Sequence, residues 1–368
     1  MNRRPVWQLV RPYLDVFDGP LLVIIGALSI LSMFTMYSSA SEFPGRMEGH
    51  VRNLLIAVLL MWAVANINPH TLMRFALPLY TFGVALLIAV VLFGVVKKGA
   101  RRWLDIGPLT IQPAEILKIG LPLMLAWYFH RREAMLRWRD FVIAGVMLAV
   151  PTGLILKQPD LGTATLVFAG GFAVIFFAGL NWKVMVAMFT AALGSLPLVW
   201  TLLHDYQRER VLTLLDPTSD PLGKGFHIIQ STIAIGSGGL LGKGWMQGTQ
   251  THLEFIPERT TDFIFSVYSE EFGLLGNIVL CGLYAALVSR GLVIAGNAPT
   301  LFSRLMAGAI TMILFMYAFV NMGMVSGILP VVGVPLPFLS YGGTAMVTLA
   351  IGLGLLMSIQ RNRKLVQT

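Results

Sequence analysis

Long apolar stretches alternate with short polar segments along almost the whole chain. A transmembrane helix needs about 20 predominantly apolar residues, and an open sheet cannot satisfy its backbone hydrogen bonds in lipid. The pattern therefore predicts an all-α integral membrane protein, a bundle of about ten transmembrane helices. The predicted spans are residues 20–40, 51–67, 73–95, 114–129, 141–157, 162–179, 184–203, 263–289, 304–326 and 343–359.

The polar segments that separate these spans are short, with one exception. Residues 204–262 form a long connection between the seventh and eighth predicted helices. No internal repeat, low-complexity segment or soluble domain boundary interrupts the chain. We therefore expect a single polytopic membrane domain over residues 1–368 with one long loop outside the bilayer.

Composition agrees with a membrane protein and excludes other classes. Hydrophobic residues make up 56% of the 368 residues and charged residues only 12%, whereas a soluble domain carries about 25% charged residues. The single cysteine, Cys281, excludes an internal disulfide and a cysteine-based metal site. The net charge of +9 is spread over the short connections without a Lys/Arg-rich domain, so we expect no nucleic-acid partner.

The N-terminus resembles a signal peptide only in part. Arg3, Arg4 and Arg11 precede the first apolar run, but the run from Pro20 to Tyr37 is longer than the usual apolar core of about 7–15 residues. More spans follow it. We therefore expect a first transmembrane helix that the mature protein retains.

The distribution of Lys and Arg predicts the orientation of the bundle. With the N-terminus inside, 14 of the 27 cationic residues fall on the inner face and 13 on the outer face. Five of those 13 belong to the loop 204–262, and loops of that length translocate largely regardless of charge. The remaining count of 14 against 8 predicts cytoplasmic termini and an extracytoplasmic long loop. Lys97, Lys98, Arg101 and Arg102 crowd one outer loop against this rule and invite a functional explanation.

Four polar clusters fall on the predicted outer face. In the first, Arg101, Arg102 and Trp103 precede Gln112, and Glu115 and Lys118 lie three residues apart on one helical face. Two explanations fit this cluster equally well. It forms either an internal salt bridge that stabilises the helix end or a cationic wall that binds an anionic head group. In the second cluster, 157–162, Asp160 is either the N-cap of the next helix or a site residue.

The third cluster is the long loop, which contains Arg210 and a glycine-rich segment at 236–244. This segment is not a nucleotide-binding loop, because Ser237 and Gly244 stand where the P-loop pattern needs glycine and a hydroxyl residue. Its glycines favour a tight fold of the loop over the membrane surface. The fourth cluster, 330–344, is rich in proline and glycine and leads into the last helix, as a tight turn or as part of a site.

Asp262 is the most informative carboxylate of the chain, because it stands where the long polar loop meets an apolar helix. It is either an N-cap or a functional group at the membrane edge. Glu270 and Glu271 follow eight and nine positions later, and the helical turn directs Glu271 away from Asp262. We expect these two glutamates to be structural.

Six strings in this order resemble the SEDS family, named for shape, elongation, division and sporulation. They are Arg-Trp…Gln-Pro-x-Glu-x-x-Lys, Gln-Pro-Asp-Leu-Gly-Thr, Asp-Pro…Asp-Pro-x-Gly, Gln-Ser…Ile-Gly-Ser-Gly-Gly, Pro-Glu-x-x-Thr-Asp-Phe and Pro-Leu-Pro-Phe-x-Ser-Tyr-Gly-Gly. The short termini and the Leu-Leu-Asp-Pro segment are similar to the branch that serves cell elongation and rod shape. The chain departs from the pattern at Ala114 and Thr344, where serine is common.

The resemblance implies ten helices and a peptidoglycan glycosyltransferase of the bacterial inner membrane, which polymerises lipid II and releases undecaprenyl diphosphate. It implies a class B penicillin-binding protein and other elongation-complex membrane proteins as partners. The family's essential acidic residue falls on Asp262, which would act as the general base. Its other sensitive positions fall on Arg101, Arg102, Trp103, Gln112, Glu115, Lys118, Asp160 and Arg210.

Two questions stay open at the level of sequence. A divalent cation, Mg²⁺ or Mn²⁺, could accompany the diphosphate, but no clean ligand set is readable. A flippase for lipid-linked precursors is the alternative function, and a scaffold for the transpeptidase is a third. A transporter would be expected to place its polar site near the bilayer midplane, whereas the polar residues here gather at the outer face.

Overall fold

The computed structural model describes residues 16–97, 100–106, 109–203, 205–219, 224–252, 256 and 258–363. Arg3, Arg4 and Arg11, Lys98, both chain ends, and Phe255 and Pro257 beside the Asp262 motif lie outside the described residues.

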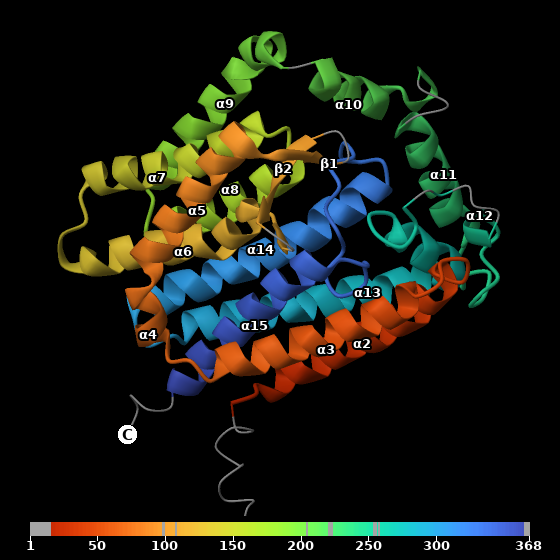
Figure 1. The fold of residues 1–368 in the computed structure, drawn as a ribbon, viewed down its shortest axis with the longest axis horizontal. Coiled ribbons are helices and arrows are strands. Elements are labelled where there is room, and N and C mark those ends of the chain that lie inside the picture. The colour runs from red at the N-terminus through yellow and green to blue at the C-terminus, as the bar shows by residue number, and fades with distance from the viewer. Residues whose placement is uncertain are drawn as a thin grey trace, which may run out of the picture.

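Each of the ten predicted spans overlaps one long helix, which confirms the predicted helical membrane bundle (Figure 1). Eight of these helices are long and apolar enough to cross a bilayer. The other two are the shorter apolar α8 and α6, which carries polar residues in its first turns. The ten helices are α2 (Gly19–Ser39), α3 (Arg46–Ala65), α5 (Ala76–Phe93), α6 (Pro113–Arg131), α7 (Trp138–Lys157), α8 (Leu161–Phe177), α9 (Trp182–Leu202), α13 (Ile264–Gly296), α14 (Leu301–Val325) and α15 (Gly343–Arg363).

Local signals in the sequence start several of these helices. Asp18, Asn181 and Thr300 are N-caps whose side chains accept hydrogen bonds from backbone N–H groups of the first turn. Pro113 occupies the first turn of α6, where its missing N–H has no helical partner to lose. The short α4 (Pro69–Arg74) follows the same logic with Asn68 as its N-cap.

The centre of the bundle is formed by α14 and α15. In the most apolar 18-residue stretch of each helix, 72% of the residues are buried. In Figure 1, α2 and α3 flank α13 and α15 on one side, and α5 to α8 lie on the other. By contrast, no residue in the most apolar stretch of α9 is buried, and this helix lies at the edge of the molecule (Figure 1).

A small antiparallel sheet occupies the connection between α5 and α6, where the pattern predicts no transmembrane span. Its strands are β1 (Val95–Lys97), β2 (Ala100–Ile106) and β3 (Leu109–Ile111), in that spatial order. Val96 pairs with Arg101 and Leu104 with Ile111. The strands are too short and too polar to register as a span in the hydropathy pattern. The ribbon nevertheless fixes the position of Arg102 and Trp103, which lie in β2.

The described parts of the loop 204–262 are largely helical. They contain α10 (Asp205–Leu215), α11 (Lys224–Ser237) and α12 (Thr249–His252), with 3-10 turns at Pro217–Ser219 here and at Glu133–Met135 between α6 and α7. The helix α11 packs on the bundle, since the buried Ser231 donates a hydrogen bond of 2.9 Å to the carbonyl of Val325 in α14.

A glycine turn of this loop docks into a break in α13. Gly273 interrupts the helix with φ 63° and ψ −160°, and the N–H groups of Leu274 and Leu275 bond the carbonyls of Gly239 and Leu240 instead of helical ones. The added Cβ of an alanine at Gly242 would lie 2.0 Å from the carbonyl oxygen of Glu271. The glycine segment is tightly packed, as predicted, but it docks into the helix that follows Asp262. Its predicted position over the membrane surface stays a prediction.

Glu270 and Glu271 hold the same junction, as expected for structural residues. Both are buried, and Glu270 accepts bonds from the Lys243 ammonium at 2.7 Å and the Gln250 backbone at 3.1 Å. Glu271 accepts from the Ser38 hydroxyl and from the Met246 backbone. The two glutamates therefore anchor the loop to α2 and α13.

Candidate functional site

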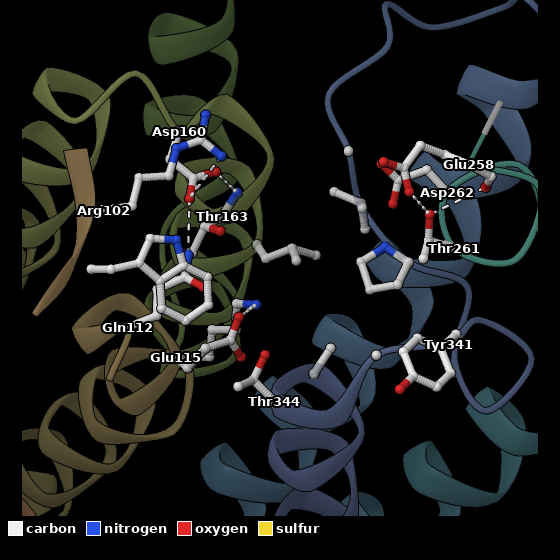
Figure 2. Close-up of a pocket in the computed structure, with 18 residues that line it drawn as sticks. Arg102, Gln112, Glu115, Asp160, Thr163, Glu258, Thr261, Asp262, Tyr341 and Thr344 are labelled. Carbon is white, nitrogen blue, oxygen red and sulfur yellow. Dashed lines mark hydrogen bonds and ion pairs between the residues drawn. The ribbon is translucent and has the colours of Figure 1, made fainter. Parts of the chain in front are cut away.

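A polar cavity of about 340 Å³ opens among α6, α8, α15, β2 and the segments before α13 and α15. Seven of the nine residues predicted as site residues line it, although they are spread over 161 sequence positions between the first and the last. These seven are Arg102, Trp103, Gln112, Glu115, Lys118, Asp160 and Asp262. Figure 2 shows Arg102, Gln112, Glu115 and Asp160 on one side and Asp262 on the other.

We call the first side the cation wall, formed by Arg102, Gln112, Glu115, Lys118 and Asp160. Asp160 is 4% exposed and lies 3.7 Å from the Arg102 guanidinium. It accepts a bond of 3.1 Å from the Gln112 amide and another of 3.1 Å from the Thr163 backbone N–H. Asp160 is thus both the N-cap of α8 and a member of the site, so the two explanations of this residue hold together.

The buried centre of the cation wall is Lys118, which is 2% exposed. Its ammonium donates to the Glu115 carboxylate and to the Tyr317 hydroxyl, both at 2.6 Å. The second oxygen of Glu115 accepts from the Thr348 hydroxyl at 2.9 Å. The predicted salt bridge between Glu115 and Lys118 is therefore present, and it lines the cavity rather than merely closing a helix end.

We call the opposite side the acid wall, formed by Glu258, Thr261 and Asp262. Asp262 is half-buried and Glu258 is exposed. Thr261 donates a hydrogen bond of 2.8 Å to the Glu258 carboxylate. The helix α13 takes Phe263 as its N-cap, so the explanation of Asp262 as that helix's N-cap is wrong.

Backbone contacts from distant segments fix the acid wall. The buried Asn321 of α14 donates to the carbonyl of Asp262 at 2.9 Å and to that of Val334 at 2.7 Å. Ser340 donates to the carbonyl of Thr261 at 2.6 Å. An added Cβ at Gly333, whose φ is +73°, would lie 3.3 Å from a carboxylate oxygen of Asp262. The proline-rich segment 330–344 is therefore the frame that positions Asp262.

The first helical hairpin supports the same wall from behind. The buried Arg259 donates to the carbonyl of Ser39 and pairs with Glu42 in the connection between α2 and α3. Arg46 donates to the Thr260 hydroxyl at 2.5 Å, and its guanidinium lies 5.1 Å from the ring centre of Tyr341, which lines the cavity.

Two predicted site residues do not line the cavity. Arg101 is exposed and turns back toward α5, where its guanidinium lies 3.5 Å from the carbonyl of Val91. Arg210 is half-buried on α10. Conversely, Glu258, Thr261, Tyr341 and Thr344 line the cavity, although only Asp262 of that side was predicted as an individual site residue. The available signal was their place in the family strings, since Glu258, Thr261 and Tyr341 stand in two of the six strings and Thr344 directly follows one of them.

The described residues contain no group of three or more His, Cys, Asp or Glu side chains that could hold a metal ion. The acid wall contributes two carboxylates, Glu258 and Asp262, to the lining of the cavity. Chemically, one side of the cavity offers the buried Lys118, the partly exposed Arg102 and further hydrogen-bond donors, which are suited to an anion although each cation is paired with a carboxylate. The other side offers carboxylates, which are suited to accepting a proton.

Comparison with known proteins gives one consistent result. Residues 14–365 match the cell cycle protein family of FtsW, RodA and SpoVE. The chain is 47% identical over 366 residues to the peptidoglycan glycosyltransferase MrdB of Escherichia coli K12, with 99% of this chain and 98% of that protein covered. It is 32% identical to the peptidoglycan glycosyltransferase RodA of Treponema pallidum, with 93% of this chain and 97% of that protein covered.

Solved structures resemble the fold over nearly its whole length. A chain from work on a peptidoglycan synthase complex that coordinates polymerization and crosslinking superposes with a TM-score of 0.81 and 37% identity, covering 94% of this chain and 98% of that chain. The rod shape determining protein RodA of Thermus thermophilus superposes with a TM-score of 0.71 and 31% identity, covering 94% and 97%.

Proposed function

This chain belongs to the cell cycle protein family of FtsW, RodA and SpoVE, the SEDS family that its motifs indicate, and from that premise we propose how its cavity works. The protein is a peptidoglycan glycosyltransferase of the rod-shape elongation type, a multi-pass protein of the bacterial inner membrane. Its substrate is lipid II, which it joins into glycan strands. The charge distribution favours cytoplasmic termini, and we therefore propose that the cavity opens on the outer face of the membrane.

In the proposed reaction, Asp262 accepts the proton from the C4 hydroxyl of the acceptor's N-acetylglucosamine. The freed oxygen attacks C1 of the donor's N-acetylmuramic acid with inversion. The bond between C1 and the diphosphate oxygen breaks, and undecaprenyl diphosphate leaves with the bonding electrons. One carboxylate can suffice, since a diphosphate leaves as a stabilised anion and does not need the second, acidic carboxyl of glycoside hydrolysis.

The observation that carries this proposal is the opposition of the two walls in one cavity (Figure 2). Arg102 and Lys118 supply positive charge on the wall opposite Asp262, where charge develops on the departing diphosphate. Asp160 and Glu115 already accept hydrogen bonds from neighbours, so we assign them to holding the cations rather than to proton transfer. We assign Gln112 of this wall, and Trp103, which also lines the cavity, to substrate binding.

A divalent cation fits this cavity only as a companion of the diphosphate. The acid wall offers two carboxylates, Glu258 and Asp262, and the described residues hold no third acidic or imidazole ligand beside them. Mg²⁺ keeps several waters and binds through one or two carboxylates together with substrate phosphates. When bound, the ion would neutralise diphosphate charge that Arg102 and Lys118 otherwise neutralise alone.

The partner that we propose is a class B penicillin-binding protein, which crosslinks the strands as they form. A structurally similar chain comes from a complex that coordinates polymerization and crosslinking, and this likeness supports the proposal. We further propose that other elongation-complex membrane proteins assemble with this pair.

The test is glycan polymerisation from labelled lipid II by the purified protein with its partner. Asp262→Asn removes the base but keeps the shape of the side chain, and we expect the rate to fall by about 10²–10⁴. The matched control is Asp105→Asn. Asp105 is an exposed residue of β2 that does not line the cavity, and we expect its substitution to leave the polymerisation rate unchanged. Polymerisation by Asp262→Asn at the wild-type rate would refute the assignment.

Three further measurements on the same preparation extend the test. Omission of the partner measures its contribution, and EDTA with Mg²⁺ or Mn²⁺ restored measures that of the cation. A lipid-flipping assay separates polymerase from transporter: movement of lipid II across a bilayer without polymer would favour the transporter.

A further inference from the structure

Two adjoining hollows lie at the end of α6 that is remote from the cavity. The first, of about 500 Å³, lies against the connection between α6 and α7, and the second, of about 800 Å³, lies between that end and α4. Arg131 lines both, so the hollows share one wall. A helix of 19 residues separates them from the cavity by about 28 Å. They therefore have no direct part in the proposed reaction.

The hollows are lined by an excess of arginines. Arg131, Arg132, Arg137 and Arg139 line the first, and Arg74 joins Arg131 in the second. Every one of these five cations is an arginine, although the chain also uses lysine. The planar guanidinium binds phosphate in a bidentate manner, which the lysine ammonium cannot do.

Little of this positive charge is neutralised by the protein. Among the described residues, only Arg132 of the five forms an ion pair, at 2.6 Å to Asp140. Asp140 is 2% exposed and also accepts from the Tyr128 hydroxyl at 3.0 Å and the Arg137 backbone at 2.8 Å. The Asp140 carboxylate therefore has its hydrogen-bond partners within the protein and holds the connection between α6 and α7 in place. The other four arginines are exposed.

Tryptophans mark the hollows as a membrane-interface feature. The Arg131 guanidinium lies 4.7 Å from the ring centre of Trp127, which lines the second hollow. Arg139 lies 5.8 Å from the ring of Trp138, which is 72% exposed. Tryptophan is enriched at the level of lipid head groups. Leu77 and Ile143, which line the hollows, add exposed apolar surface.

We propose that the two hollows bind the head group of an anionic phospholipid in the leaflet opposite the cavity. Basic hollows between transmembrane helices are suited to such head groups. Because two hollows share Arg131, the arrangement fits a lipid with two phosphates, such as diphosphatidylglycerol, better than a lipid with one. The general excess of Lys and Arg on inner faces does not by itself explain five arginines gathered around two hollows.

The experiment measures lipid binding by native mass spectrometry of the full chain, titrated with diphosphatidylglycerol, phosphatidylglycerol or phosphatidylcholine. The test variant is Arg131→Gln/Arg137→Gln/Arg139→Gln, which keeps Arg132 and its ion pair with Asp140. The control, Lys183→Gln/Arg304→Gln/Arg363→Gln, removes the same charge at other helix ends of the same face.

We expect wild type to prefer diphosphatidylglycerol, then phosphatidylglycerol, then phosphatidylcholine. The test variant should bind diphosphatidylglycerol at least roughly tenfold more weakly, since each arginine near an anionic surface contributes severalfold. The control should change binding by less than about threefold. Equal losses in the test variant and the control would overturn the proposal, because net charge alone would then explain binding.

Two further arms keep the result decisive. Arg131→Lys/Arg137→Lys/Arg139→Lys retains the charge, and we expect it to bind between wild type and the glutamine variant; it serves as the test variant should that one fail to fold. Inorganic diphosphate is the competitor. If millimolar diphosphate displaces the lipid completely, the hollows bind a soluble phosphate compound and the lipid assignment is wrong.

Discussion

The cation wall and the acid wall of the cavity are built in opposite ways. On the cation wall, side chains bind one another: Lys118 bonds Glu115 and Tyr317, and Arg102 and Gln112 engage Asp160. On the acid wall, the backbone is held instead, by Asn321 at Asp262 and by Ser340 at Thr261.

This difference suggests that the two walls contribute differently to stability and to activity. A side-chain network in a buried setting is costly to disturb, because removing one member leaves another charge without compensation. A frame that holds the backbone fixes a carboxylate in place while leaving its side chain half-buried beside the cavity. We expect the first wall to govern stability and activity together and the second to govern activity with little change in stability.

The largest effect should come from the buried lysine. Lys118→Met should lower polymerisation by about 10²–10³ because a cation for the diphosphate is lost. It should also destabilise the protein by up to about 3–5 kcal/mol, because the half-buried Glu115 loses its cationic partner. The polymerisation assay and thermal unfolding in detergent measure these changes. The double variant Glu115→Leu/Lys118→Met should recover stability but not activity; recovery of both would show that Lys118 is only structural.

The second effect compares neighbouring arginines of β2. Arg102→Gln should reduce polymerisation by about tenfold to a hundredfold, since this cation lines the cavity and its side chain is 28% exposed. Arg101→Gln, which removes the same charge one residue away, should change the rate less than about threefold, as surface charges usually do. Initial rates over a range of lipid II concentrations provide the comparison. Equal losses would mean that Arg101 and Arg102 act through general attraction of the anionic substrate.

The third effect tests the frame of the acid wall. Gly333→Ala places a Cβ near the Asp262 carboxylate and costs about 1–2 kcal/mol for a side chain at positive φ. We expect kcat to fall about tenfold, because a displaced Asp262 carboxylate should raise the activation free energy by about 1.4 kcal/mol. Gly342→Ala is the matched control, because this cavity-lining glycine has open space at its Cβ position. Normal kcat in Gly333→Ala would separate Asp262 from the segment 330–344.

The smallest effect should come from the second carboxylate of the acid wall. Glu258→Gln removes the negative charge of this side chain but retains an oxygen that can accept from Thr261. We therefore expect the rate to fall by only about threefold to tenfold, no more than one ordinary hydrogen bond contributes. The rate is compared with that of Asp262→Asn in the same assay. A loss as large as that of Asp262→Asn would assign the base to the pair rather than to Asp262 alone.

Much of the fold could be predicted from residue pattern because lipid restricts the choices. Ten apolar stretches predict ten helices, since a helix is the simplest way to satisfy the backbone in a bilayer. Asp160 as a helix cap and Pro113 in a first turn were likewise readable from local chemistry. The β-ribbon was not, because its short strands are stabilised by pairing with one another rather than by a local pattern.

The sequence alone determined the membrane bundle, the family strings and the set of polar residues from which a site could be built, because these depend on residue type and on local spacing. Only the tertiary structure decided that Arg102 enters the cavity while Arg101 does not, and that Asp262 is framed by Asn321 and Gly333 rather than capping its helix. Those outcomes depend on how helices far apart in sequence pack together, and no local pattern encodes such long-range contacts.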